Sequence, residues 1–232
     1  MRWMDGARRT GGWIWVFAGL LLQLGWGIGY AVWPGVITGA LLVAITLLAV
    51  CSLPPLAARL PGIVRVLGTV VAVLLALSLL GAVADRFGLF GPVGASGVSW
   101  GSWPAFVAYT ASLLPGPLGS LATVAAVAAT LLEVALGVLL LAGWQRRWVG
   151  KVTAGLFTIY LLAMGVMLGL GEVVRYGVPM LIGGALLVSA TPTRREHRIQ
   201  HQAAEQGPER RPDPGDRQPA GRDHDRQCRR QA

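Results

Sequence analysis

Long apolar runs, separated by short polar segments, occupy most of the chain between residues 13 and 190. A helix needs about 20 predominantly apolar residues to cross a bilayer. Runs of that order predict membrane-crossing helices at about 64–84, 119–143, 149–169 and 174–190.

The first apolar region, 13–53, is too long for one crossing and fits two. Pro34 disfavours a helical conformation at Trp33, and Gly35 permits a turn. We therefore expect spans at about 13–31 and 36–53. The pattern predicts an all-α integral membrane protein with six transmembrane helices.

The segment from Asp85 to Leu118 is the longest connection between predicted spans. Its first half is rich in Gly and Pro, which favours irregular structure. Ser102 can cap a helix that begins with Trp103 and Pro104. We expect an interfacial or re-entrant helix at 103–114, and an ordinary loop resting on the bilayer is the alternative.

Composition agrees with a membrane protein that carries a polar tail. Hydrophobic residues make up 54% of the chain, charged residues 13%, and the mean hydropathy is +0.58. Residues 192–232 hold ten arginines and seven acids but no aromatic residue and only one aliphatic β-branched residue, an Ile. Such a segment cannot bury a core, so we expect a disordered cytoplasmic tail. Its interleaved acids and lack of aromatic residues argue against nucleic-acid binding.

Positive charge predicts the orientation. With six spans, the arginines before the first span, the loops at 54–63 and 144–148, and the tail all lie on one face. The other face keeps only Arg86 and Arg175. Cytoplasmic loops are enriched in Lys and Arg, so we expect a multi-pass protein of the plasma (inner) membrane with both termini cytoplasmic. No cleavage site follows the apolar N-terminal run, which we expect to stay uncleaved.

Glu133 is the one ionisable residue between 121 and 143. An acid near the middle of a membrane is costly and should face a partner or a cavity. Thr130, Glu133, Gly137 and Leu140 follow helical spacing and line one face. Two roles fit: an acid that ties helices together by hydrogen bonds, or a proton relay to a quinone. Tyr160 is a candidate phenolic partner, and simple packing is its other role.

Two acid–base pairs flank the predicted outer face of the bundle. Asp85 and Arg86 end the third span, and Glu172 and Arg175 open the turn into the sixth. They can meet across the mouth of the bundle and bind a polar headgroup or small anion, or they are separate solvated charges. The candidate binding residues are Asp85, Arg86, Trp103, Tyr109, Thr130 and Arg175.

Metal and dithiol chemistry have few candidates. All three histidines lie in the tail, and Cys51 and Cys228 form no C-x-x-C motif. Dithiol redox chemistry is therefore not expected, and no metal site is evident.

Three stretches together resemble the DoxX family of small membrane proteins. They are ADRFGLFGPVG with VSWGSWPAFVAYTASLLP (84–94, 98–115), ATLLEVALGVLLLAGWQRRWVGK (129–151), and LFTIYLLAMGVMLG with RYGVPMLIGGALLVSA (156–169, 175–190). The resemblance covers about 64–190. It implies a four-helix membrane domain there, to which 1–53 adds a two-helix transmembrane hairpin.

The resemblance also implies a class of function. The family includes the small membrane subunit of a thiosulfate:quinone oxidoreductase. We expect a membrane subunit or accessory protein of an oxidoreductase, with quinone as the cofactor and a soluble or membrane redox protein as the partner. A non-catalytic scaffold or a small-molecule transporter is the alternative. A transporter usually shows repeated halves, and no clear repeat is visible.

Overall fold

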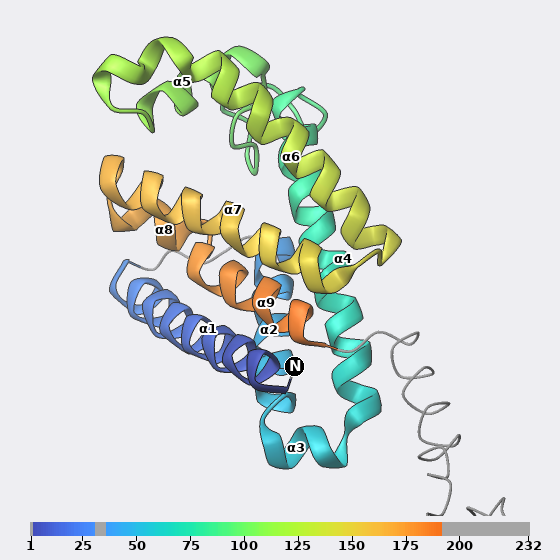
Figure 1. Cartoon of the computed structure of the whole chain (residues 1–232). Coiled ribbons are helices and arrows are strands. Elements are labelled where there is room, and N and C mark those ends of the chain that lie inside the picture. Colours follow the sequence, from blue (N-terminus) through green and yellow to red (C-terminus); the bar gives the residue numbers. More distant parts are fainter. Residues whose placement is uncertain (1, 31–35, 192–232) are drawn as a thin grey trace, which may run out of the picture. The chain divides into compact units, whose positions relative to one another are not determined.

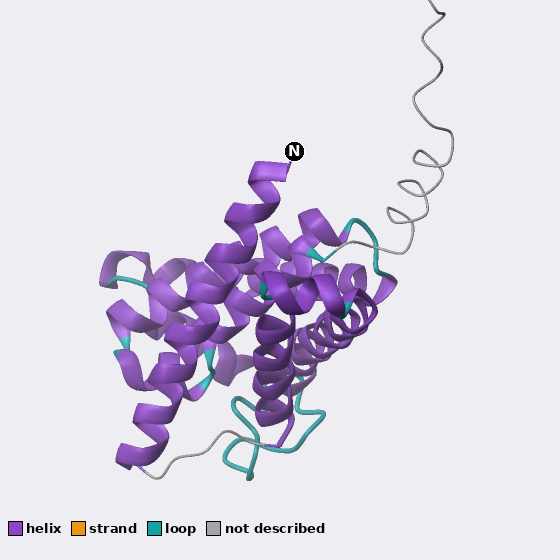
Figure 2. Cartoon of the chain, turned by 90° about the horizontal axis from the view of Figure 1, so that it is seen from below, coloured by secondary structure: helices purple, strands orange, loops and turns teal. Residues whose placement is uncertain are grey.

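The computed structural model describes residues 2–30 and 36–191, and within these ranges the regular secondary structure is entirely helical (Figures 1 and 2). The all-α prediction is confirmed. The long helices are α1 (Arg2–Tyr30), α2 (Val36–Cys51), α4 (Pro61–Arg86), α6 (Ala122–Ala142), α7 (Arg146–Met167) and α9 (Val178–Ala190). Shorter helices connect them: α3 (Pro54–Arg59), α5 (Trp103–Ser112), the 3-10 helix η1 (Gly116–Leu121) and α8 (Leu170–Arg175).

Three helical segments of the described chain are long and apolar enough to cross a membrane: Pro61–Arg86, Gly116–Ala142 and Arg146–Met167. The chain is therefore a helical membrane protein by the length and composition of these segments. Two further apolar helices, Thr38–Cys51 and Val178–Ala190, are shorter. The predicted break at Trp33, Pro34 and Gly35 lies outside the described residues.

Helix α9 is surrounded by other helices and forms the centre of the packing. Only two of its residues are not buried. In Figure 1 it lies between α1 and α7. Glycines permit the close approach, because a Cβ on Gly183 would lie 2.8 Å from the Gly12 carbonyl oxygen and one on Gly150 would lie 2.7 Å from the Ala185 carbonyl oxygen. Small residues bring helix backbones together in this way where lipid offers no hydrophobic drive.

Neighbouring long helices run in opposite directions. Gly12 of α1 packs on Leu187 near the end of α9, whereas Gly19 packs on Met180 near its beginning. Trp13 Nε1 donates a hydrogen bond to Ser52 Oγ at 2.8 Å, which places the first half of α1 beside the end of α2. Helix α1 therefore runs antiparallel to both α9 and α2.

The N-terminal hairpin belongs to the same packing unit as the rest of the helices. Residues 1–191 form one compact unit, and α1 and α2 both pack against α9. The sequence boundary at residue 53 therefore does not coincide with a gap in the packing. The predicted disorder of 192–232 lies outside the described residues.

Two connecting elements decide where the functional site lies. The predicted helix at 103–114 is present as α5, and Ser102 caps it as expected, with Oγ accepting from Ala105 N at 3.4 Å. The sixth predicted span, at about 174–190, begins later in the structure, because α8 ends at Arg175 and α9 begins only at Val178 after a break. Gly177, with φ of +63°, makes this break since a left-handed conformation cannot continue a right-handed helix.

Candidate functional site

Glu133 lies in the middle of α6 on the face that the bundle buries. Its side chain is 2% exposed. The expected face is confirmed, because Thr130, Gly137 and Leu140 are buried with it. Gly137 leaves room for α4, since a Cβ there would lie 2.8 Å from Leu80 Cγ. The carboxyl group therefore faces the helices rather than lipid.

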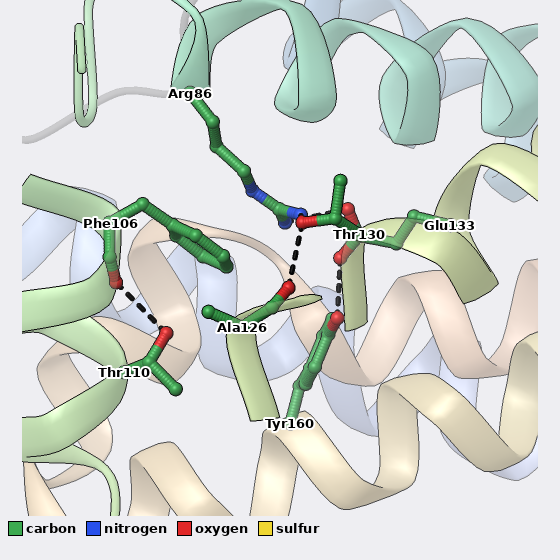
Figure 3. A network of polar contacts seen from close by, with 7 residues as sticks. All are labelled: Arg86, Phe106, Thr110, Ala126, Thr130, Glu133 and Tyr160. Atoms are coloured by element: carbon green, nitrogen blue, oxygen red, sulfur yellow. Dashed lines mark hydrogen bonds and ion pairs between the residues drawn. The ribbon is translucent and has the colours of Figure 1, made fainter. Parts of the chain in front are cut away.

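Arg86 reaches Glu133 from the last turn of α4. Its Nη2 lies 2.6 Å from Glu133 Oε2, and each side chain is 2% exposed. Arg86 Nη1 also donates to Thr130 Oγ1 at 2.7 Å, and the Thr130 hydroxyl donates onward to the Ala126 carbonyl at 2.8 Å (Figure 3). Pairing inside the protein makes the two charges tolerable at a depth where either alone is costly.

Tyr160 of α7 completes the network. Its hydroxyl donates a hydrogen bond to Glu133 Oε1, opposite the oxygen that faces Arg86 (Figure 3). The Phe157 ring packs edge-on against the Tyr160 ring, with centroids 6.4 Å apart. Arg86, Glu133 and Tyr160 thus join α4, α6 and α7 through one carboxylate. We call these three residues and Thr130 the buried polar network.

Aromatic rings cover the Arg86 guanidinium on the side that faces α5. Its Cζ lies 3.7 Å from the centroid of the Phe106 ring and 5.3 Å from that of Trp100. The two rings meet edge to face, with centroids 5.2 Å apart. A cation held over aromatic faces is stabilised by their quadrupoles, the more so when water is excluded. Helix α5 therefore closes the buried polar network at this end.

Asp85 points away from its neighbour Arg86 and organises the loop 87–102. Its Oδ2 accepts hydrogen bonds from Ser99 N at 3.0 Å and Trp100 N at 2.9 Å. These bonds hold the backbone of Trp100 in the position from which its ring covers Arg86. Consecutive residues at the end of α4 therefore serve two different tasks.

Three buried polar atoms near this aromatic cover have no hydrogen-bond partner. They are Arg86 Nε, Tyr109 Oη and Asp85 Oδ1. Tyr109 lies against Trp100, with ring centroids 5.8 Å apart. Burial raises the pKa of Tyr109 above its usual range, and the nearby Tyr176 and Glu172 raise it further, so the phenol stays a donor. Two buried donors, Arg86 Nε and Tyr109 Oη, thus lack an acceptor.

The two acid–base pairs expected at the mouth do not face each other. Arg86 turns into the bundle and Asp85 turns to the loop, whereas Arg175 and Glu172 pair with one another at 3.4 Å. Arg175 is 61% exposed, which fits the alternative of solvated charges. The expected meeting of the two pairs does not occur because Arg86 pairs with Glu133, which would otherwise lack a counter-charge.

The remaining predicted residues lie near the cover but outside the network. Trp103 stacks on Phe87 with centroids 5.8 Å apart, and it also contacts Phe106. Sequence reasoning did not assign Trp100 and Phe106 to Arg86. The available signal was that both aromatic residues lie in the segment 85–118 that follows Arg86.

No family model, curated protein or solved structure matches this chain. The resemblance to the DoxX family stays a prediction. Within residues 2–30 and 36–191, no three of His, Cys, Asp and Glu gather as a metal site would need. The groups available for binding are donors and aromatic rings.

Proposed function

We propose that this chain is a DoxX-like integral membrane subunit or accessory protein of a membrane-associated oxidoreductase, and that it binds a quinone headgroup beside the buried polar network. The observation that carries the proposal is the pair of Arg86 and Glu133, each 2% exposed, with Tyr160 on the same carboxylate. Ionisable groups at such depth are rare and usually functional.

The donors near Arg86 suit a quinone. A quinone accepts two electrons and two protons on reduction, and in its oxidised form it presents two carbonyl acceptors on a flat ring. Arg86 Nε and Tyr109 Oη are buried donors without an acceptor, and Trp100 and Phe106 offer aromatic faces beside them. These four residues would hold and orient the headgroup. Apolar pockets with a few well-placed polar groups are typical of cofactor sites.

Glu133 and Tyr160 would hold and move protons in this arrangement. The Glu133 carboxylate can take up a proton and release it again, and the Tyr160 hydroxyl donates a hydrogen bond to it while it is ionised. Arg86 keeps the carboxylate charge compensated while Glu133 is ionised. The electrons would come from a separate redox protein.

The membrane arrangement that goes with this function has six spans and cytoplasmic termini in the plasma (inner) membrane. It is supported by the antiparallel packing of α1 against α2 and α9 and by the arginine distribution. Helices α2 and α9 are short, so their flanking segments would have to contribute to the crossing of the membrane.

A non-catalytic scaffold is the second candidate, and a specific observation favours it. Both Arg86 Nη atoms, the Thr130 hydroxyl and the Tyr160 hydroxyl find partners inside the network. Such a network can tie α4, α6 and α7 together without any chemistry.

Quinone content separates the two candidates. The protein is purified from its membranes in mild detergent, its lipids are extracted, and quinone per mole of protein is measured by chromatography. We expect near-stoichiometric quinone in the wild type and in the control Glu172→Gln, which alters a partly exposed acid that pairs with Arg175. Tyr109→Phe and Phe106→Leu should each lower the quinone content severalfold while thermal stability stays close to that of the wild type. If the wild-type protein contains no quinone, or if all variants retain it, the quinone site is contradicted and the scaffold role is favoured.

A further inference from the structure

A second cationic site lies at the opposite ends of the same helices, where α4 begins and α6 passes into α7. The Thr69 hydroxyl connects its two arginines. It donates to the Arg65 carbonyl at 3.0 Å and accepts from Arg146 Nη1 at 2.9 Å. Residues one helical turn apart share a face, so the Arg146 guanidinium lies on the face of α4 that carries Arg65.

Both arginines have unmet hydrogen-bonding capacity. Arg65 Nε and Arg146 Nε are buried and have no partner. The acids with described side chains are engaged elsewhere: Asp85 with loop amides, Glu133 with Arg86, and Glu172 with Arg175. Partly buried cations without a counter-ion are costly, so this arrangement calls for an anion.

The position of the site identifies the source of that anion. Arg65 lies in the second turn of α4 and Arg146 begins α7, so both lie at the ends of apolar segments long enough to cross a membrane. Trp144 and Trp148 nearby are 59% and 62% exposed, and Lys151 Nζ lies 4.3 Å from the centroid of the Trp148 ring. Exposed Trp and cationic residues at helix ends are typical of the headgroup layer of a bilayer.

We propose that Arg65, Thr69 and Arg146 bind the phosphate group of an anionic phospholipid. Planar guanidinium groups match the geometry of phosphate oxygens, which accept several hydrogen bonds at once. Trp148 and Lys151 follow Arg146 in the first two turns of α7, at the same end of the helix. The site is separate from the buried polar network, and it does not depend on the proposed quinone chemistry.

Lipid binding to the full-length purified protein tests the site. The apparent affinity for phosphatidylglycerol and for phosphatidylcholine is measured by thermal shift in detergent, and bound lipids are counted by native mass spectrometry. We expect phosphatidylglycerol to bind and stabilise preferentially. Arg65→Gln and Arg146→Gln should each weaken this binding about fivefold, and Arg175→Gln, at the opposite helix ends, should leave it unchanged. Inorganic phosphate should not substitute, because it lacks the acyl chains.

Arg65→Lys and Arg146→Lys provide the folded comparison if a Gln variant unfolds. They keep the charge but lose the planar fork, so a smaller loss of affinity is expected. Equal affinity for phosphatidylglycerol in all variants would overturn the proposal. So would a preference that disappears when the ten tail arginines are changed to Gln while Arg65 and Arg146 are intact, since the tail would then govern lipid binding.

Discussion

The guanidinium of Arg86 lies 2.6 Å from the carboxylate of Glu133, although one residue ends α4 and the other lies in the middle of α6. The long arginine side chain makes this possible by running down into the bundle from the helix end. A mid-helix acid and a helix-end base thereby form one compensated pair. This pair fixes the relative positions of α4 and α6 and brings Tyr160 of α7 to the same carboxylate.

Replacing Glu133 by Leu should destabilise the protein strongly. The substitution leaves Arg86 buried without its counter-charge, and breaking a buried pair from one side costs about 3–5 kcal/mol. Glu133→Gln should cost less, because its amide oxygen still accepts from Tyr160 or Arg86. Thermal unfolding in a fixed detergent gives the order wild type, Gln, Leu.

The matched control for Glu133 is Glu172→Gln, which alters an acid of an exposed pair and should change stability by no more than about 0.5 kcal/mol. The double variant Arg86→Met with Glu133→Leu should recover part of the loss, because neither charge is then left alone. If Glu133→Leu unfolds at the wild-type temperature, the pair does not contribute to stability as described.

Tyr160→Phe removes one hydrogen bond to the carboxylate and leaves the ring packed on Phe157. Hydrogen bonds to charged groups contribute about 1.5–3 kcal/mol, so a loss of that order is expected. In the background of Glu133→Leu the same change should be nearly silent, since the acceptor has gone. Additive losses in this double-mutant cycle would show that the two side chains act independently.

The sequence predicted the helices well because apolar run length and turn residues are local properties. The long helices, the α5 helix and its Ser102 cap follow from such patterns, and Glu133 stood out as a lone acid in a long apolar run. A turn into the last helix was expected at Glu172 and Arg175, but the residue that ends this turn, Gly177, was not identified. Gly177 adopts a left-handed conformation there, and a glycine inside an apolar run does not by itself reveal it.

The partner of Glu133 was the part that sequence alone did not supply. Between residues 66 and 145 the charged residues are only Asp85, Arg86 and Glu133, so a pairing within this set was the available signal. Whether Arg86 or Asp85 turns inward depends on side-chain direction at the last turn of α4. That direction is decided by the loop amides that capture Asp85 and by the rings that cover Arg86.

Gly183→Ala tests the packing of α1 on α9. An added Cβ would lie 2.6 Å from Val16 Cγ2 and 2.8 Å from the Gly12 carbonyl oxygen, so the two helices must move apart. Overpacking of this kind costs about 1–3 kcal/mol. Gly155→Ala in α7 is the control, because nothing lies within 4 Å of its Cβ position, and it should be neutral or stabilising by up to about 1 kcal/mol. Similar melting temperatures for both variants would contradict the close approach of α1.

Asp85→Ala should release the loop 87–102 while α4 stays folded. Ser99 N and Trp100 N lose their shared acceptor, and the Trp100 ring then lacks the anchor that keeps it over Arg86. Limited proteolysis should cut this loop faster in Asp85→Ala than in the wild type. Asp85→Asn retains one oxygen acceptor and should fall between the two. Equal cleavage rates would show that the loop is held by its other contacts.

Single-cysteine labelling tests the orientation that the arginine distribution predicts. Ser96 lies in the loop before α5, and Ala58 lies in α3 on the side expected to be cytoplasmic; both are exposed. Ser96→Cys and Ala58→Cys are each made in a chain without Cys51 and Cys228, and intact cells are treated with an impermeant thiol reagent. Cytoplasmic enrichment of Lys and Arg predicts that Ser96→Cys is labelled and Ala58→Cys is not. Permeabilised cells should label both, which shows that each thiol is reactive. Labelling of Ala58→Cys alone would mean that the topology is inverted. Labelling of both in intact cells would mean that α4, which lies between the two sites, does not cross the membrane.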